Sequence, residues 1–291
     1  MESIKLTEGS RAAKLARRNG GPAVRSDNRS RAIGVFDSGI GGLTVLKALI
    51  DLLPFEDFIY LGDTARTPYG AKSREIILRY SLENTRFLLA KGIKLLVLAC
   101  NTSSAIALEQ IIAETTIPVI GVIEPGAIAA VKASRSGKIG VIGTEATIAS
   151  GAYTRAIHQL RSQAELYTRA CPMLVPLVEE GWTENEIARQ TVELYLESLR
   201  ASGIDTLLLG CTHYPLLRNL FAKTLGRGVQ IVDSATATAL AVRDRLRALG
   251  LLSKPRSGSQ SYFVTEMPER FIRVGRRFIG AGVESAVRLE R

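Results

Sequence analysis

The sequence predicts an α/β protein made of two similar, open and mostly parallel α/β domains, related by internal duplication, with its site in the cleft between them. From residue 32 onward, apolar runs of strand length alternate with longer helical segments, the pattern of parallel sheets flanked by helices. One phrase occurs twice, as LLVLACNT at 95–102 and as TLLLGCTH at 206–213. Each copy predicts a buried strand that delivers its last polar side chains into a crevice beyond the sheet.

A second landmark repeats at nearly the same distance. Ile33 and Ile139 begin similar apolar runs 106 residues apart, and Cys100 and Cys211 lie 111 residues apart. Two independent landmarks with one period indicate an internal duplication.

Residue composition and helix-ending residues predict the elements of the first half. Strands are short runs of Ile, Val, Leu and Phe, which suit a sheet covered on both faces, and Pro54 ends the first helix. In chain order we expect a strand at 33–36, a helix at 43–53, a strand at 58–61, a helix at 73–91, a strand at 95–98, a helix at 103–114 and a strand at 119–123, followed by a helix to 133.

The second half restarts the pattern, since 138–144 resembles 32–38. We expect a helix at 150–160, strands at 206–209 and 229–234, and a helix at 235–249. The strand at 262–264 and the helix from Pro268 are expected to return to the first half. The predicted organisation is a disordered basic tail (1–31), a first domain (32–121 plus 237–291) and a second domain (122–236).

The positive charge lies at the two ends of the chain. Of the net charge of +10, residues 1–32 carry +5 and residues 252–291 carry +4, so the body is close to neutral. Because nucleic-acid-binding domains gather basic residues on one face, we expect no nucleic-acid partner. The tail lacks apolar periodicity, which predicts disorder. A nucleic-acid or regulatory arm is an alternative, and a transit peptide is disfavoured by its acidic residues.

Cysteine usage and hydropathy indicate a cytoplasmic protein. The chain has 291 residues, 46% of them hydrophobic, enough to fill two cores. Its three cysteines are an odd number at wide spacing, which fits a reducing compartment. Apolar runs stop well short of the ~20 residues that a membrane span needs, so we expect no membrane partner.

Cys100 and Cys211 are the candidate reactive groups. Each lies between a strand and a predicted helix start, where a thiol's pKa is lowered and its nucleophilic thiolate forms more readily. Buried structural cysteines are common in α/β cores, and this alternative suits Cys171, which lies outside the repeat. Two cysteines at equivalent positions of a duplicated chain favour a functional role.

His213 follows Cys211 by two residues, where it can stabilise a thiolate or relay a proton. A loop histidine that only caps or packs is the alternative. Metal binding needs a ligand cluster, and the sequence has no Cys-x-x-Cys pair, so we expect no metal.

The loop at 37–42 (DSGIGG) lies between a strand and a helix and can present backbone N–H groups to an anion. A dinucleotide loop would need its third glycine at Thr44, and a tight turn without a ligand is the alternative. Asp37, beside those donors, could bind an ammonium group. An anion site, an ammonium acceptor and two facing thiols suit an α-amino acid whose α-proton one thiol removes while the other thiol protonates the opposite face.

Six motifs, in order, resemble those of the glutamate racemases, cofactor-independent members of the aspartate/glutamate racemase superfamily. The resemblance runs from about Ile33 to Ala286 and is carried by VFDSGIGG (35–42), GDTAR with PYG (62–70), ACNT (99–102), GVIEPG (121–126), VPLVE (175–179) and GCTHYP (210–215).

The resemblance implies interconversion of L- and D-glutamate without a cofactor, and a role in supplying D-glutamate for peptidoglycan. It implies that Cys100 acts on the D-enantiomer, assisted by Asp37, and that Cys211 acts on the L-enantiomer, assisted by Glu179 and His213. It further implies a homodimer and substrate contacts from Asp37, Ser38, Tyr69, Gly70, Asn101, Thr102, Thr212 and His213.

One tension and two alternatives remain. A carboxylate beside a thiol raises the thiol's pKa, so Asp37 is better suited to accept a proton or bind the ammonium group than to stabilise a Cys100 thiolate. The alternatives are a racemase of another acidic amino acid and a non-catalytic binding or regulatory protein. A binding cleft has no need of two thiols, which favours the enzyme.

Overall fold

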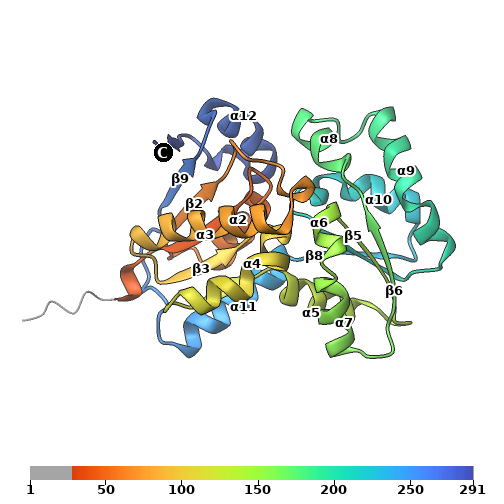
Figure 1. Ribbon diagram of the computed structural model, residues 1–291, viewed down its shortest axis with the longest axis horizontal. Coiled ribbons are helices and arrows are strands. Elements are labelled where there is room, and N and C mark those ends of the chain that lie inside the picture. The colour runs from red at the N-terminus through yellow and green to blue at the C-terminus, as the bar shows by residue number, and fades with distance from the viewer. Residues whose placement is uncertain (1–27, 291) are drawn as a thin grey trace, which may run out of the picture.

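The computed structural model describes residues 28–290, which form two separate parallel sheets with helices packed on their faces (Figure 1). The first sheet has the spatial order β10-β9-β2-β1-β3-β4, and every neighbouring pair is parallel. Its strands are β1 (Ile33–Asp37), β2 (Phe58–Gly62), β3 (Leu95–Leu98), β4 (Val119–Gly121), β9 (Gln260–Val264) and β10 (Val287–Arg288).

The second sheet has the order β6-β5-β7-β8, again with parallel neighbours only. Its strands are β5 (Lys138–Gly143), β6 (Glu165–Ala170), β7 (Thr206–Gly210) and β8 (Gln230–Asp233). The order β2-β1-β3-β4 in the first sheet has the same connectivity as β6-β5-β7-β8 in the second. The predicted fold class of two similar parallel α/β halves is therefore confirmed, and β9 and β10 return to the first half as expected.

Helices connect the strands and cover both sheets. They are α2 (Leu43–Leu52), α3 (Arg74–Ala90), α4 (Asn101–Glu114), α5 (Ile123–Ala133), α6 (Glu145–Ala149), α7 (Ala152–Leu160), α8 (Leu174–Glu180), α9 (Glu186–Ala201), α10 (Arg218–Leu225), α11 (Ala235–Ala248) and α12 (Pro268–Ile279), with 3-10 turns η1 (Asn28–Ser30), η2 (Tyr69–Ala71), η3 (Tyr214–Leu217) and η4 (Gly280–Gly282).

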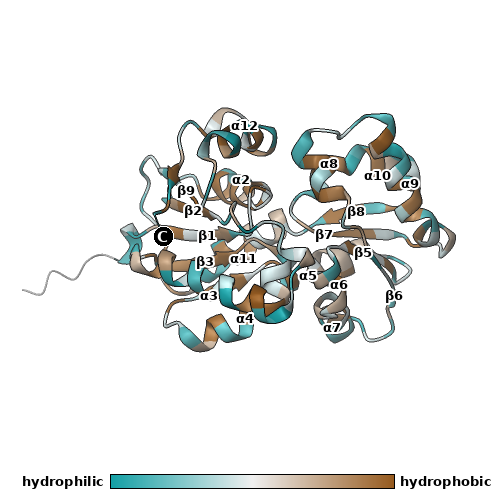
Figure 2. Ribbon diagram, turned by 45° about the horizontal axis from the view of Figure 1, so that its top comes forward, coloured by the Kyte–Doolittle hydropathy of each residue, from teal (hydrophilic) through white to brown (hydrophobic). Residues whose placement is uncertain are grey.

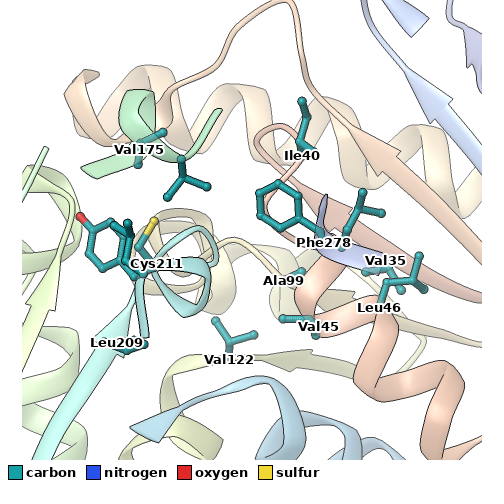
Figure 3. Packing of buried hydrophobic residues seen from close by; sticks show 14 of the residues in the cluster. Val35, Ile40, Val45, Leu46, Ala99, Val122, Val175, Leu209, Cys211 and Phe278 are labelled. Carbon is teal, nitrogen blue, oxygen red and sulfur yellow. The ribbon is translucent and has the colours of Figure 1, made fainter. Parts of the chain in front are cut away.

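Burial explains which strands are central. All residues of β1, β3 and β7 are buried, whereas the edge strand β6 is half-buried to exposed and mostly polar (Figure 2). The largest apolar cluster runs through both halves: Figure 3 shows Val35 and Phe278 from the first half in the same cluster as Val175 and Cys211 from the second. The two halves therefore share part of their core.

Several helix starts differ from the expectation. Helix α4 begins at Asn101, directly after its N-cap Cys100, instead of at 103. Helix α5 begins at Ile123 and includes Glu124 to Gly126, because a proline in the first helical turn gives up an N–H that has no partner there. The helix expected at 150–160 is α7, which begins at Ala152 after its N-cap Gly151 with φ of 65°, and a short helix that was not expected, α6, precedes it.

The predicted tail falls almost wholly outside the described residues, which begin at Asn28. Residues Asn28–Ser30 form the 3-10 turn η1, and the Lys94 ammonium donates to the Arg29 carbonyl over 2.6 Å. The chain passes from one sheet to the other between β4 and β5, and back between β8 and β9. The exact domain boundaries stay a prediction. Within residues 28–290, no helix is long and apolar enough to cross a membrane.

Candidate active site

The carboxyl ends of strands from both sheets meet at the division between the halves. Strand β1 ends at Asp37, β3 leads into Cys100, and β7 leads into Cys211. Contacts join the two sides directly: the Thr212 hydroxyl donates to Asp37 Oδ1 over 3.5 Å, and Thr102 lies 2.9 Å from Thr144, oxygen to oxygen. The structure thus brings the two repeated phrases to one place.

The first cysteine lies in an environment that favours the neutral thiol. Cys100 is buried and its Sγ donates to the Ser38 hydroxyl over 3.4 Å. Burial, and next the nearby Asp37 carboxylate, raise the pKa of this thiol to about 11, although hydrogen bonds with Ser38 and Ser103 oppose the rise. The expectation that the helix N-terminus lowers the pKa of Cys100 is wrong, since desolvation outweighs it. The expected effect of Asp37 is confirmed.

Asp37 is held by its own loop. Its Oδ2 accepts the Gly39 backbone N–H over 2.9 Å, and Gly42 provides a second backbone donor. Full burial raises the pKa of the carboxyl, although the nearby His213 and these two backbone donors oppose the rise. The expectation that the glycine-rich loop offers its N–H groups to a ligand is wrong for these two donors, because Asp37 occupies them.

The same loop packs tightly against the second half. A Cβ at Gly41 would lie 2.4 Å from His213 Nδ1 and 2.4 Å from Thr212 Oγ1. Thr44, in the first turn of α2, donates to the Thr212 carbonyl over 3.3 Å. The absence of a side chain at Gly41 therefore allows the two strand ends to approach each other.

The second cysteine, Cys211, lies beside a histidine and a glutamate, and we call Cys211, His213 and Glu179 the relay. Cys211 Sγ lies 3.9 Å from His213 Nδ1, and His213 Nε2 lies 3.2 Å from Glu179 Oε1 on helix α8. A 3-10 turn, η3, follows Cys211 instead of an α-helix, so the helix N-terminus argument does not extend to it. The sequence spacing between Cys211 and His213 is a direct contact in the structure.

The charges of neighbouring groups determine the protonation states of His213 and Glu179. Burial lowers the pKa of His213, but Cys211 and Glu179 outweigh it and raise that pKa to about 10. Burial likewise raises the pKa of Glu179, whereas His213 and Arg270 lower it by more. At neutral pH the pair is therefore an imidazolium and a carboxylate, with Nδ1–H available to the sulfur.

Asn101 carries a buried amide group without a partner. The Tyr153 hydroxyl from helix α7 donates to Asn101 Oδ1 over 2.5 Å, which directs the amide across the division between the halves. Asn101 Nδ2 is buried and has no hydrogen-bond partner among the described residues. Because buried donors are normally satisfied, this group is suited to a ligand's acceptor.

The other predicted contact residues line the same junction. A Cβ at Gly70 would lie 2.3 Å from Thr144, and Thr102 also lies 3.0 Å from Thr147, oxygen to oxygen. Tyr69 is fully buried, and its hydroxyl donates to the Asp63 carboxylate and accepts from Asn84 Nδ2 over 3.0 Å. The Tyr69 hydroxyl is thus engaged within the first half, and the substrate contact expected of Tyr69 stays a prediction.

Several residues at this junction carry no sequence signal of their own. Tyr153 and Thr144 reach it from the second half, and Arg270, Arg277 and Phe278 reach it from α12 near the C-terminus. None lies in a recognisable motif next to a cysteine, and only the tertiary structure brings them there. In contrast, Cys171 lies in the apolar cluster, and its Sγ donates to the Arg169 carbonyl over 3.7 Å.

The arrangement can perform proton transfer from two sides. One thiol is neutral and the other lies beside an imidazolium, and both are free cysteines at the ends of parallel strands from opposite halves. In the part of the chain that the structure describes, no group of three or more His, Cys, Asp or Glu side chains could hold a metal ion.

Comparisons with known proteins agree on one family. The Asp/Glu/hydantoin racemase family matches residues 58–242. A glutamate racemase from Geobacter metallireducens is 57% identical over 252 residues, which cover 86% of this chain and 93% of that protein.

Solved structures give the same result. A glutamate racemase from Bacillus anthracis superposes with a TM-score of 0.87 at 40% identity, covering 90% of this chain and 98% of the other. A Francisella tularensis glutamate racemase, solved in complex with D-glutamate, has a TM-score of 0.85 at 36% identity with the same coverage.

Proposed function

The chain belongs to the Asp/Glu/hydantoin racemase family, and within it to the glutamate racemases, and from this premise we propose that it interconverts L- and D-glutamate with two cysteine thiols and no cofactor. The observation that carries the mechanism is the pair Cys100 and Cys211, which follow equivalent strands, β3 and β7, of two sheets with the same strand order. This equivalence supports a mechanism in which one thiol acts from each half.

In the direction from L to D, Cys211 acts as the base. Its thiolate, stabilised by the His213 imidazolium, takes the α-proton of L-glutamate, so the Cα–H bond breaks and a carbanion forms. Cys100, whose pKa is raised to about 11 and which is therefore a neutral thiol, protonates the opposite face of that carbon. In the reverse direction Cys100 takes the proton and Cys211 returns it, as microscopic reversibility requires.

The groups between the thiols bind the substrate. Asp37 is buried at the junction and accepts the substrate ammonium group, and the unpartnered Asn101 Nδ2 donates to a substrate carboxylate. Ser38, Gly70, Thr102 and Thr212 complete the contacts. The α-carbanion is a high-energy intermediate, so hydrogen-bond donors fixed around the substrate carboxylate must stabilise its negative charge.

The wider setting is part of the same proposal. Both reactive cysteines must stay free thiols, which suits the cytoplasm, and the product serves peptidoglycan synthesis, as the resemblance implies. We also expect a homodimer, which light scattering of the purified full chain would test.

The deciding experiment is incubation of the purified chain with L-glutamate in D2O without added pyridoxal phosphate. Optical rotation should decay to zero while the α-proton NMR signal disappears, because each turnover replaces that proton from solvent. L-aspartate in a parallel reaction tests the alternative acidic substrate. Absence of both racemization and exchange with either amino acid would exclude the proposed reaction and favour a non-catalytic binding protein.

A further inference from the structure

Helix α12 of the first half contacts the second half at the groups that support Cys211. Three of its residues reach across the division, Arg270, Arg277 and Phe278. Their spacing of seven and eight residues places them on one face of the helix. In Figure 1, α12 and α8 lie at the same end of the molecule, on opposite sides of the division.

The Glu179 carboxylate is shared between the two halves. Oε1 lies 3.2 Å from His213 Nε2, and Oε2 accepts from Arg270 Nη2 over 3.3 Å. The same guanidinium nitrogen lies 3.5 Å from Glu180 Oε1. The side chain of Glu179 is only 10% exposed, so a fixed charged partner on its second oxygen strongly restricts its orientation.

Two further contacts fix the backbone and the ring of the relay. Arg277 Nη1 donates to the Glu179 carbonyl over 3.0 Å, and the Phe278 ring meets the His213 ring edge to face, with centroids 5.7 Å apart. Glu179 and Glu180 are the last residues of α8, where the helix dipole disfavours negative charge. The two arginines of α12 compensate for this unfavourable position.

We propose that Arg270 is a positioning residue, which holds Glu179 against His213 and thereby aligns the imidazolium with Cys211. The inference rests on the proposed racemization, and it extends the site to an element that no cysteine motif includes. Arg270 comes from the first half and Glu179 from the second, so this contact supports Cys211 from across the division between the halves.

The proposal predicts an effect on one thiol only. Racemization has an equilibrium constant of one, so kcat/KM must fall equally in both directions, whichever proton transfer is slowed. Primary isotope effects separate the two transfers. If the transfer at Cys211 slows, it becomes more rate-limiting, so the effect on kcat/KM rises with α-deuterated L-glutamate and falls with α-deuterated D-glutamate.

The test compares Arg270→Met, Arg270→Lys and Arg273→Met in the full chain. Arg273 lies on the exposed face of the same helix and has no ion pair or hydrogen bond among the described residues, so its variant controls for loss of charge and helix propensity. We expect Arg270→Met to lower kcat/KM by roughly tenfold in both directions, with the opposed isotope shifts, because a buried carboxylate loses a charge-assisted hydrogen bond. Arg270→Lys should recover part of the loss, and Arg273→Met should stay within about twofold of the wild type.

The outcomes separate the inference from the function. Isotope effects do not depend on the fraction of folded protein, so a partly unfolded variant still gives an answer. A loss in Arg270→Met without opposed isotope shifts, or activity equal to that of Arg273→Met, overturns the positioning role while wild-type racemization stands. A wild-type chain that does not racemize glutamate overturns the proposed function itself.

Discussion

The two cysteine sites occupy equivalent positions in two similar sheets, yet their surroundings are chemically opposite. Cys100 caps helix α4 and lies beside a serine hydroxyl and the Asp37 carboxylate, which together with burial favour the neutral thiol. Cys211 precedes a 3-10 turn and lies beside His213, whose positive charge Glu179 maintains. The fold supplies equivalent placement, whereas the neighbouring side chains supply a carboxylate beside one sulfur and an imidazolium beside the other.

This contrast suits a reaction in which one thiol deprotonates a carbon and the other protonates its opposite face. A racemase must hold one thiol protonated and the other deprotonated at the same moment, because two thiolates cannot donate and two thiols cannot accept. In the proposed mechanism, the departure from symmetry favours the form in which Cys100 is the neutral thiol.

Removing either thiol should have the largest effect on activity. We expect Cys100→Ser and Cys211→Ser each to lower kcat/KM by about 1,000-fold in both directions, because a serine hydroxyl is a far weaker acid than a thiol. Polarimetry with each enantiomer measures the loss. Cys171→Ala, in the apolar cluster, is the matched control and should retain activity within about twofold. A cysteine-to-serine variant at either site with wild-type turnover would contradict the two-thiol mechanism.

The next largest effect should come from neutralising the carboxylate that serves Cys211. Glu179→Gln removes a group that raises the pKa of His213, so less imidazolium is present and kcat/KM should fall by about 100-fold. The isotope effect with α-deuterated L-glutamate should rise. Glu184→Gln, at an exposed position after the same helix, is the control. If both variants lose activity equally, the relay does not depend on Glu179.

A smaller effect on activity is expected from removing the Tyr153 hydroxyl, by which the second half contacts Asn101 of the first. Tyr153→Phe removes the hydroxyl that orients the Asn101 amide, and we expect KM to rise by roughly tenfold with a smaller change in kcat, as for loss of one hydrogen bond. Tyr167→Phe, which removes an exposed hydrogen bond of 2.9 Å from the Tyr167 hydroxyl to Glu165, serves as the control. An unchanged KM for Tyr153→Phe would show that Asn101 is held in place by other contacts.

The smallest expected effect is the pH dependence of stability on the Cys211 side. The folded pKa of His213 is about 10, above its ordinary value of 6.5, so its contribution to folding is complete below pH 6.5 and is lost as the pH rises toward 10. Urea unfolding at pH 6, 8 and 9.5 should show a wild-type advantage over His213→Asn that shrinks with pH. An advantage that grows with pH would mean that the ring is buried in its neutral form.

Sequence patterns predicted the parallel sheets well because buried strands are continuous apolar runs and the duplication repeats them. They also predicted that Asp37, Cys100 and Cys211 lie at the carboxyl ends of strands, with His213 two residues after Cys211. They did not predict the edge strand β6, whose residues are largely polar, nor the helices α8, α9 and α10.

The residues that support the site from other elements could not be predicted from the sequence, for a different reason. Arg270 lies 91 residues after Glu179, and Tyr153 lies 52 residues after Asn101, with no shared motif. Likewise, the effect of burial on Cys100 depends on every atom around the sulfur. Contacts made by tertiary packing leave no periodic trace in a single sequence.

The return of β9, β10 and α12 to the first sheet has a consequence for synthesis on the ribosome. By Asp233 the chain has supplied all four strands of the second sheet, but only four of the six strands of the first. Since domains fold during translation as their residues emerge, the inserted second half is complete before the half that encloses it. Helix α12, which carries Arg270, emerges after the second half, so the contact between Arg270 and Glu179 can form only after the second half is complete.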